Sequence, residues 1–179
     1  SLISKAVTTN PSEVAPRLAL IQFYLNKKDG KKALTAANDA AAAIPDKPEI
    51  LDALGRTQQF SGDFNQAMST YGKLSTLQPN SPLAQMRLAE INLANKNKDE
   101  AAKSLKKALD IKPDLIEAQR GLILLALDAK KPNEALGIAR QVQQQKPKEP
   151  VGFVLEGDVY ASEKAWPDAI KAYQNGLKQ

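Results

Sequence analysis

Apolar residues recur every three or four positions through most of this sequence, and short polar segments interrupt them. This spacing places the apolar side chains on one face of an α-helix. In one clear stretch, a first helix is marked by Leu83, Met86, Leu88, Ala89 and Leu93, and a second by Ala101, Ala102, Leu105, Ala108 and Leu109. The polar turn at residues 95–98 separates the two stretches, so the pattern predicts a pair of antiparallel helices.

Proline recurs with a period of 34 residues, at Pro11, Pro45, Pro79, Pro113 and Pro147. Alanine recurs with the same period, at Ala33, Ala67, Ala101, Ala135 and Ala169. Proline lacks an N–H and disfavours the α conformation in the residue before it, so we expect each periodic proline to end a second helix. The period therefore predicts repeated helix pairs, each of which packs on its neighbours.

The period defines one continuous array. Residues 1–13 are expected to be the end of a preceding repeat, and repeats follow at 14–47, 48–81, 82–115 and 116–149, with an incomplete one at 150–179. The predicted fold is an all-α, right-handed α-solenoid, a superhelix of antiparallel helix pairs. We interpret the chain as a fragment of a longer array whose exposed apolar edges, including Ile170, Tyr173 and Leu177, favour end-to-end self-association.

These positions resemble the tetratricopeptide repeat (TPR) over essentially the whole chain. At the position of the family's small residue in the first helix, this sequence has Gly55, Ala89 and Gly157. The family's alanine in the second helix is present in all five repeats. The large residue four positions further on is Tyr71, Leu105 and Tyr173. Isoleucine replaces the small residue at Ile21 and Ile123, and alanine replaces the large one at Ala37 and Ala139. We expect these departures to alter the local helix spacing.

The resemblance implies a protein–protein interaction scaffold that binds its partner in a concave groove of first helices. Carried over to this sequence, the groove positions are Asp52, Arg56, Gln59, Phe60, Met86, Arg87, Glu90, Leu93, Glu117, Arg120, Leu124, Leu127, Asp128 and Asp158. Arginines among apolar and acidic residues suit a peptide or helix that carries carboxylates. The alternative for Leu93, Leu124 and Leu127 is packing between neighbouring first helices.

The amino-acid composition argues against several classes of functional site. The 179 residues include no Cys and no His, which removes disulfides, Cys/His zinc sites and the commonest acid–base side chain. No nucleophile with a base, no carboxylate pair and no glycine-rich phosphate loop stands out. We therefore expect no enzymatic activity, no cofactor, no metal ion and no small-molecule substrate.

The net charge of +5 makes nucleic acid a candidate binding partner. Many lysines fall in turns or on second helices, and aromatic residues do not alternate with them as base-stacking platforms would. This distribution disfavours nucleic-acid binding and favours a protein or peptide partner. A nucleic-acid-binding helical repeat therefore ranks below the other interpretations.

The Ala-, Gln- and Lys-rich repeats look similar to large bacterial arrays, above all the TPR lipoproteins of PEP-CTERM protein sorting and exopolysaccharide export. That resemblance implies a place in the bacterial cell envelope, periplasmic or membrane-anchored through a segment outside this sequence. A cytoplasmic location stays open. The main alternative function is a regulatory or substrate-selecting array attached to an enzyme domain elsewhere in a longer chain.

Overall fold

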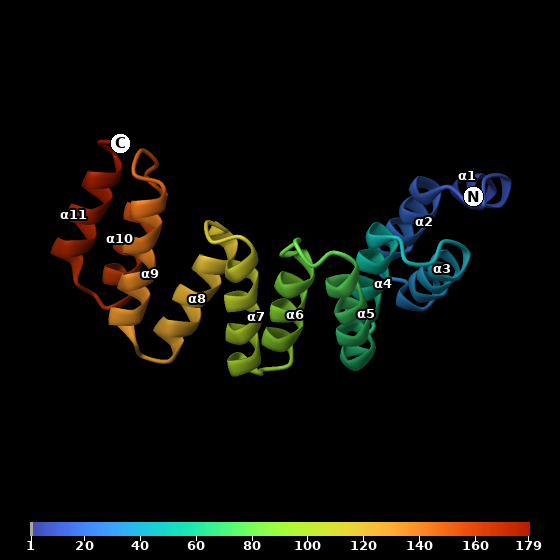
Figure 1. Ribbon diagram of the computed structural model, residues 1–179, viewed down its shortest axis with the longest axis horizontal. Coiled ribbons are helices and arrows are strands. Elements are labelled where there is room, and N and C mark those ends of the chain that lie inside the picture. The colour runs from blue at the N-terminus through green and yellow to red at the C-terminus, as the bar shows by residue number, and fades with distance from the viewer. Residues whose placement is uncertain (1) are drawn as a thin grey trace. The chain divides into compact units, whose positions relative to one another are not determined.

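The computed structural model describes residues 2–179, which form eleven α-helices and no β-strand. Figure 1 shows them in chain order, from blue to red. The helices are α1 (Leu2–Thr9), α2 (Val14–Asn26), α3 (Gly30–Ala43), α4 (Pro48–Phe60), α5 (Phe64–Leu77), α6 (Leu83–Ala94), α7 (Lys98–Ile111), α8 (Ile116–Asp128), α9 (Pro132–Gln145), α10 (Val151–Ser162) and α11 (Trp166–Gly176). The predicted all-α fold class is confirmed.

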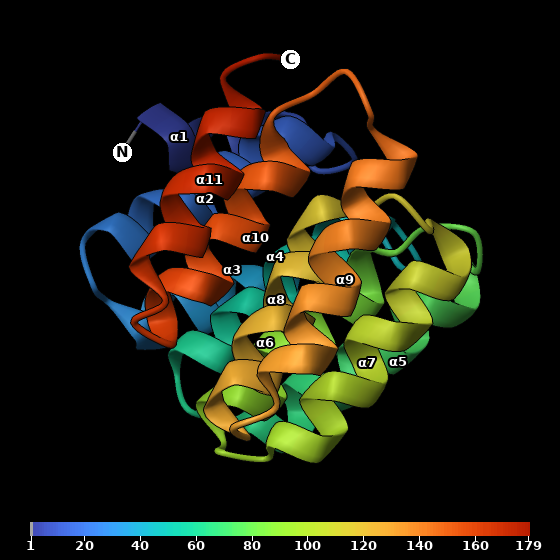
Figure 2. The ribbon, with the colours of Figure 1, turned by 90° about the vertical axis from the view of Figure 1, so that its left-hand side faces the viewer.

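The helices gather into two compact units. The N-terminal unit extends to Lys96, and the C-terminal unit runs from Asn97 to Gln179. In the N-terminal unit consecutive helices from α1 through α6 pack on one another, and α2 also packs on α4. In the C-terminal unit α7 to α11 pack in the same way, and α8 also packs on α10. Short turns join the helices into hairpins, such as α4–α5 in Figure 1 and α10–α11 in Figure 2.

The periodic prolines stand two residues beyond the helices that they were expected to end. Between each of α3, α5, α7 and α9 and its proline lies one cap residue, namely Ile44, Gln78, Lys112 and Lys146, with φ of −133°, −128°, −134° and −132°. Their ψ angles of 63° to 92° place all four outside the α region, which a following proline disfavours in its predecessor. The prediction that proline closes these helices is confirmed.

The turns inside the helix pairs share a left-handed residue at the same period. This residue has a φ of 55° to 82° and is Lys28, Gly62, Lys96, Lys130 or Lys164. In four of the turns the next N–H reaches back five residues, as from Asp63 to the Gln58 carbonyl at 2.8 Å. This is the hydrogen bond of a Schellman motif, which normally places glycine at the left-handed position. Four of the five turns here use lysine instead.

Close helix contacts in the core explain where small residues are required. A Cβ atom built on Gly55 would lie 2.5 Å from the ring of Tyr71, and one on Gly157 would lie 2.3 Å from the ring of Tyr173. Only glycine therefore fits beneath these tyrosines.

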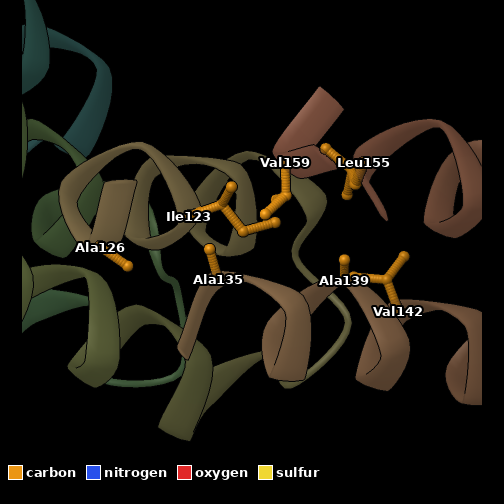
Figure 3. Close-up of a cluster of buried hydrophobic side chains, with 7 residues drawn as sticks. All are labelled: Ile123, Ala126, Ala135, Ala139, Val142, Leu155 and Val159. Atoms are coloured by element: carbon orange, nitrogen blue, oxygen red, sulfur yellow. The ribbon is translucent and has the colours of Figure 1, made fainter. Parts of the chain in front are cut away.

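The two pairs of departures from the family pattern are reciprocal. Ile21 and Ala37 are buried in one hydrophobic cluster, and Ile123 and Ala139 are buried in another, shown in Figure 3. Where the first helix carries the large residue, the second helix carries the small one. The exchange keeps one large and one small side chain at each of these positions, which is how a packed core accepts a change of sequence.

Candidate functional site

A groove in the N-terminal unit has a volume of about 590 Å³. Helices α2 and α4 provide most of its wall, and the start of α6 completes it. We call it the N-terminal groove. It is lined by Leu18, Ala19, Ile21, Gln22, Leu25, Pro48, Glu49, Asp52, Ala53, Arg56, Gln78 and Leu83.

Each of the two main helices contributes a row of side chains at the i, i+3 or i+4, and i+7 spacing of one helix face. The row on α2 consists of Leu18, Gln22 and Leu25, and the row on α4 consists of Glu49, Asp52 and Arg56. One wall is thus largely apolar and the other is charged.

The helices α2 and α4 run in the same direction. Gly30, the first residue of α3 just after the end of α2, lies beside Phe60 at the end of α4: a Cβ atom on Gly30 would be 3.4 Å from that ring. The acidic residues of the α4 row therefore lie toward the N-terminal ends of both helices. Arg56 lies toward their C-terminal ends.

Asp52 is held by an ion pair with Arg87 of α6. The Arg87 Nε donates to Asp52 Oδ1 at 2.9 Å, and Nη2 donates to Oδ2 at 3.3 Å. Nη1 donates to Glu90 Oε2 at 3.1 Å. Burial disfavours the charge on Arg87, but the hydrogen bonds from Asp52 and Glu90 outweigh it and raise the arginine pKa. The guanidinium of Arg87 is thus engaged within the chain.

Arg56 differs from Arg87 in being unpaired. Its side chain is exposed, and it has no hydrogen bond or ion pair to any residue that the structure describes. Glu49, at the other end of the α4 row, has one long ion pair to Lys47 at 4.0 Å. The N-terminal groove therefore offers an accessible carboxylate at one end and a free guanidinium at the other.

Other predicted site residues of the N-terminal unit lie outside this lining. Phe60 is 52% exposed and its ring faces Gly30, while Leu93 is 43% exposed. Gln59 and Met86 are half-buried. Of the predicted residues, the groove lining includes Asp52 and Arg56.

In the C-terminal unit, three predicted residues of α8 are exposed, namely Glu117, Arg120 and Leu124. Leu127 instead packs against the hydrophobic cluster of Figure 3, as the packing alternative for this leucine expects. The predicted set on α8 thus divides between surface and core.

Two predicted carboxylates of the C-terminal unit have partners within it. Asp128 accepts a hydrogen bond from Lys98 Nζ at 2.6 Å and lines a separate pocket of about 540 Å³ on α7, α8 and the start of α9. Asp158 accepts a hydrogen bond from the Tyr173 hydroxyl at 2.8 Å, and this bond raises the pKa of Tyr173. Neither carboxylate is a free binding group.

The sequence prediction missed the α2 side of the N-terminal groove. Leu18 and Gln22 stand 34 residues before Asp52 and Arg56, so the period placed them at the same positions of the preceding repeat. The repeat register was therefore a sufficient signal for this wall.

Within residues 2–179, no group of three or more acidic side chains is placed to hold a metal ion. The same residues contain no helix that is both long and apolar enough to span a membrane.

Comparison with known proteins supports a TPR assignment. The family model described as tetratricopeptide repeat matches residues 61–123. No curated protein matches this sequence.

Solved structures resemble the fold over most of the chain. The crystal structure of MamA protein has a TM-score of 0.66 at 22% identity and covers 90% of this chain and 88% of its own. YrrB, a TPR protein with an unusual peptide-binding site, has a TM-score of 0.60 at 15% identity and covers 99% and 92%. A TPR protein from Parabacteroides merdae has a TM-score of 0.68 at 16% identity and covers 98% and 70%. The chain therefore has a TPR-like helical-repeat fold, with a tetratricopeptide repeat matched at residues 61–123.

Proposed function

We propose that this chain is a non-catalytic scaffold that binds a peptide or helix of a protein partner in the N-terminal groove. One observation carries the proposal: the unpaired guanidinium of Arg56 stands beside an apolar row in a groove of about 590 Å³. An exposed cation next to apolar surface can bind a carboxylate while the apolar row buries a neighbouring side chain.

The comparisons agree with this kind of partner. YrrB, which shares the fold at 15% identity, is described as having an unusual peptide-binding site. Helical repeats present such grooves because each repeat adds one more first helix to a continuous surface. The support is thus the local chemistry of the groove together with a fold that accommodates peptides elsewhere.

The test is to fill the groove without disturbing the core. Ala19 lines the groove and is exposed, so Ala19→Arg places a long side chain there and removes no buried group. Ala42 is exposed on α3 outside the lining, and Ala42→Arg is its matched control. A photo-crosslinker at position 19 should capture a protein partner, and Ala19→Arg should abolish its binding while Ala42→Arg leaves it intact. Equal binding by both variants would contradict the proposal.

The finer proposal is that the scaffold works in a bacterial cell-envelope assembly concerned with protein sorting or exopolysaccharide export. It rests on the resemblance of the Ala-, Gln- and Lys-rich repeats to TPR lipoproteins of that system. Fractionation of the source cell tests it: the native protein should be found with the envelope, and a purely cytosolic protein would contradict it.

A further inference from the structure

We infer that the N-terminal groove takes an amphipathic helix that runs antiparallel to α2 and α4, with acidic residues in its first turn and basic residues in its last. The inference rests on the proposed function and specifies the partner segment that the groove recognises. It follows from the backbone chemistry of the groove, the spacing of its side chains and the order of its charges.

The backbone chemistry favours a helix over an extended peptide. The groove wall is formed mostly by α2 and α4, whose inner N–H and C=O groups are already bonded within each helix. An extended peptide would have to satisfy its own backbone groups with side chains, of which Gln22, Gln78 and Arg56 are the main donors in the lining. A helical segment satisfies its backbone internally and needs only side-chain contacts.

The spacing of the two rows also matches a helix. Leu18, Gln22 and Leu25 follow one another at about one helical turn, roughly 5.4 Å along the axis. An amphipathic helix presents its apolar anchors at the same interval, whereas same-face residues of a strand are roughly 6.7 Å apart. A helix bound along the groove can therefore place one apolar anchor beside each turn of α2 and α4.

The charges of the groove are ordered along its axis. Glu49 lies at the N-terminal end of α4, and Asp52 follows one turn later in its ion pair with Arg87, which lies outside the groove lining. Lys47 offsets part of this negative charge through its long contact with Glu49.

The other end of the groove is positive. Arg56 stands unpaired near the C-terminal end of α4. Beyond the end of α2 lie two exposed lysines, Lys27 and Lys28. The groove therefore changes from acidic to basic in the direction of α2 and α4.

This order of charges selects the direction of the partner. A helix is stabilised by acidic residues in its first turn and basic residues in its last, because these offset its macrodipole. Laid antiparallel to α2 and α4, such a helix places its acidic turn beside Arg56 and its basic turn beside Glu49. A parallel helix could match the groove charges only with a charge order that opposes its own dipole.

The probe is a pair of designed peptides rather than a natural partner. Both are amphipathic helices of about four turns with leucine anchors, held helical by a lactam staple. One carries Glu in its first turn and Lys in its last, and the other has the same composition with the two ends exchanged. The first peptide matches the groove charges only when it lies antiparallel to α2 and α4, so a photo-crosslinker in its first turn should react with residues near Arg56 and not with residues near Glu49. Fluorescence anisotropy checks that both peptides bind, and mass spectrometry locates the crosslinks.

Variants of the protein sharpen the assignment. The double variant Glu49→Lys with Arg56→Glu reverses the order of charge and should move the crosslinks of the first peptide's first turn to the N-terminal ends of α2 and α4. Lys107→Glu is the matched control, because Lys107 is exposed on α7 outside the groove lining and should leave the crosslink positions unchanged. Circular dichroism checks that every variant remains helical.

The outcomes separate the inference from the proposed function. Crosslinks from the first turn of the first peptide to residues near Glu49, or equally to both ends of the groove, would overturn the direction assigned here. Capture of a natural partner that binds the groove in an extended form would overturn the helix and leave the proposed function standing. If Ala19→Arg also has no effect on partner binding, the proposed function itself fails.

Discussion

The second and fourth predicted repeats place the large and the small core residue on opposite helices of the pair. In α4–α5 the first helix carries glycine, Gly55, and the second carries a fully buried tyrosine, Tyr71. In α8–α9 the first helix carries Ile123 and the second carries Ala139, and both are buried. The comparison teaches that the repeat requires one large and one small residue at this position, without requiring which helix carries which.

The largest expected effect is the loss of stability when only one residue of the Gly55–Tyr71 pair is changed. Gly55→Ile drives a branched side chain into the ring of Tyr71, whose 0% exposure leaves it no route outward, and should cost about 3 kcal/mol or more of unfolding free energy. Tyr71→Ala leaves a cavity and should cost about 3–5 kcal/mol. The double variant recreates the arrangement of Ile123 and Ala139, so it should be at least about 2 kcal/mol more stable than the sum of the two losses predicts.

Urea unfolding followed by circular dichroism measures these energies, and hydrogen exchange assigns them to α4–α5. Gly72→Ile is the control, because nothing lies within 4 Å of a Cβ atom at this exposed position of α5. It should leave stability unchanged or raise it slightly, through better helix propensity. Strictly additive losses in the double variant would show that the two side chains do not share one space.

A second difference between the repeats is the hydroxyl group that tyrosine brings and alanine lacks. The Tyr71 hydroxyl donates to the Asp52 carbonyl oxygen at 3.3 Å. Burial raises the pKa of Tyr71, and the nearby Asp52 carboxylate raises it further. The folded pKa thus exceeds the unfolded value of about 10. Its contribution to stability is complete below that pH and is lost as pH rises toward the folded pKa.

Tyr71→Phe tests this linkage. At neutral pH the variant should lose about 1 kcal/mol, the value of one buried hydrogen bond. Above about pH 10 the unfolding free energy of the natural chain should decline more steeply than that of the variant, by up to about 1.4 kcal/mol per pH unit. Urea unfolding at pH 8, pH 10 and pH 11 provides the comparison. Parallel pH profiles for the two proteins would show that Tyr71 ionises as easily in the folded state as in the unfolded one.

Features that depend on local chemistry could be predicted from the sequence. Proline disfavours the α conformation in the residue before it whatever the surroundings, so the ends of α3, α5, α7 and α9 followed directly from Pro45, Pro79, Pro113 and Pro147. The binding residues were harder, because they depend on how helices pack. Arg87 and Asp52 are 35 residues apart in sequence, and only the packing of α6 near α4 shows that they bind each other. The same packing leaves Arg56 without a partner.

The left-handed turns were also hidden from sequence reasoning. Glycine at Gly62 is a visible signal, but lysine at the equivalent position of the other repeats is not. The conformation is imposed there by the hydrogen bonds that reverse the chain, such as the one from the Lys131 N–H to the Ala126 carbonyl at 2.8 Å. Lysine therefore occupies a backbone conformation that glycine adopts with less strain.

The smallest expected effect tests these turns in the same two repeats. Gly62 has a φ of 82° and Lys130 a φ of 58°. Lys130→Gly should relieve strain of about 1 kcal/mol, offset in part by the greater freedom of glycine in the unfolded chain, and so stabilise α8–α9 by a few tenths of a kcal/mol. Gly62→Lys should destabilise α4–α5 by about 1 kcal/mol, since no atom lies within 4 Å of the added Cβ and only the backbone opposes it.

Lys131→Gly separates strain relief from the simple effect of adding glycine. Lys131 neighbours Lys130 but has a φ of −118°, which any residue adopts without left-handed strain. Its replacement should therefore mainly add unfolded-state entropy and destabilise α8–α9 by about 0.5–1 kcal/mol, since the ion pair it loses, with Glu134 at 3.8 Å, is exposed and contributes little. Thermal unfolding followed by the fluorescence of Trp166 reports on the C-terminal unit, in which this tryptophan lies. If Lys130→Gly and Lys131→Gly lower stability equally, the left-handed lysine stores no strain, and the two repeats differ in their cores alone.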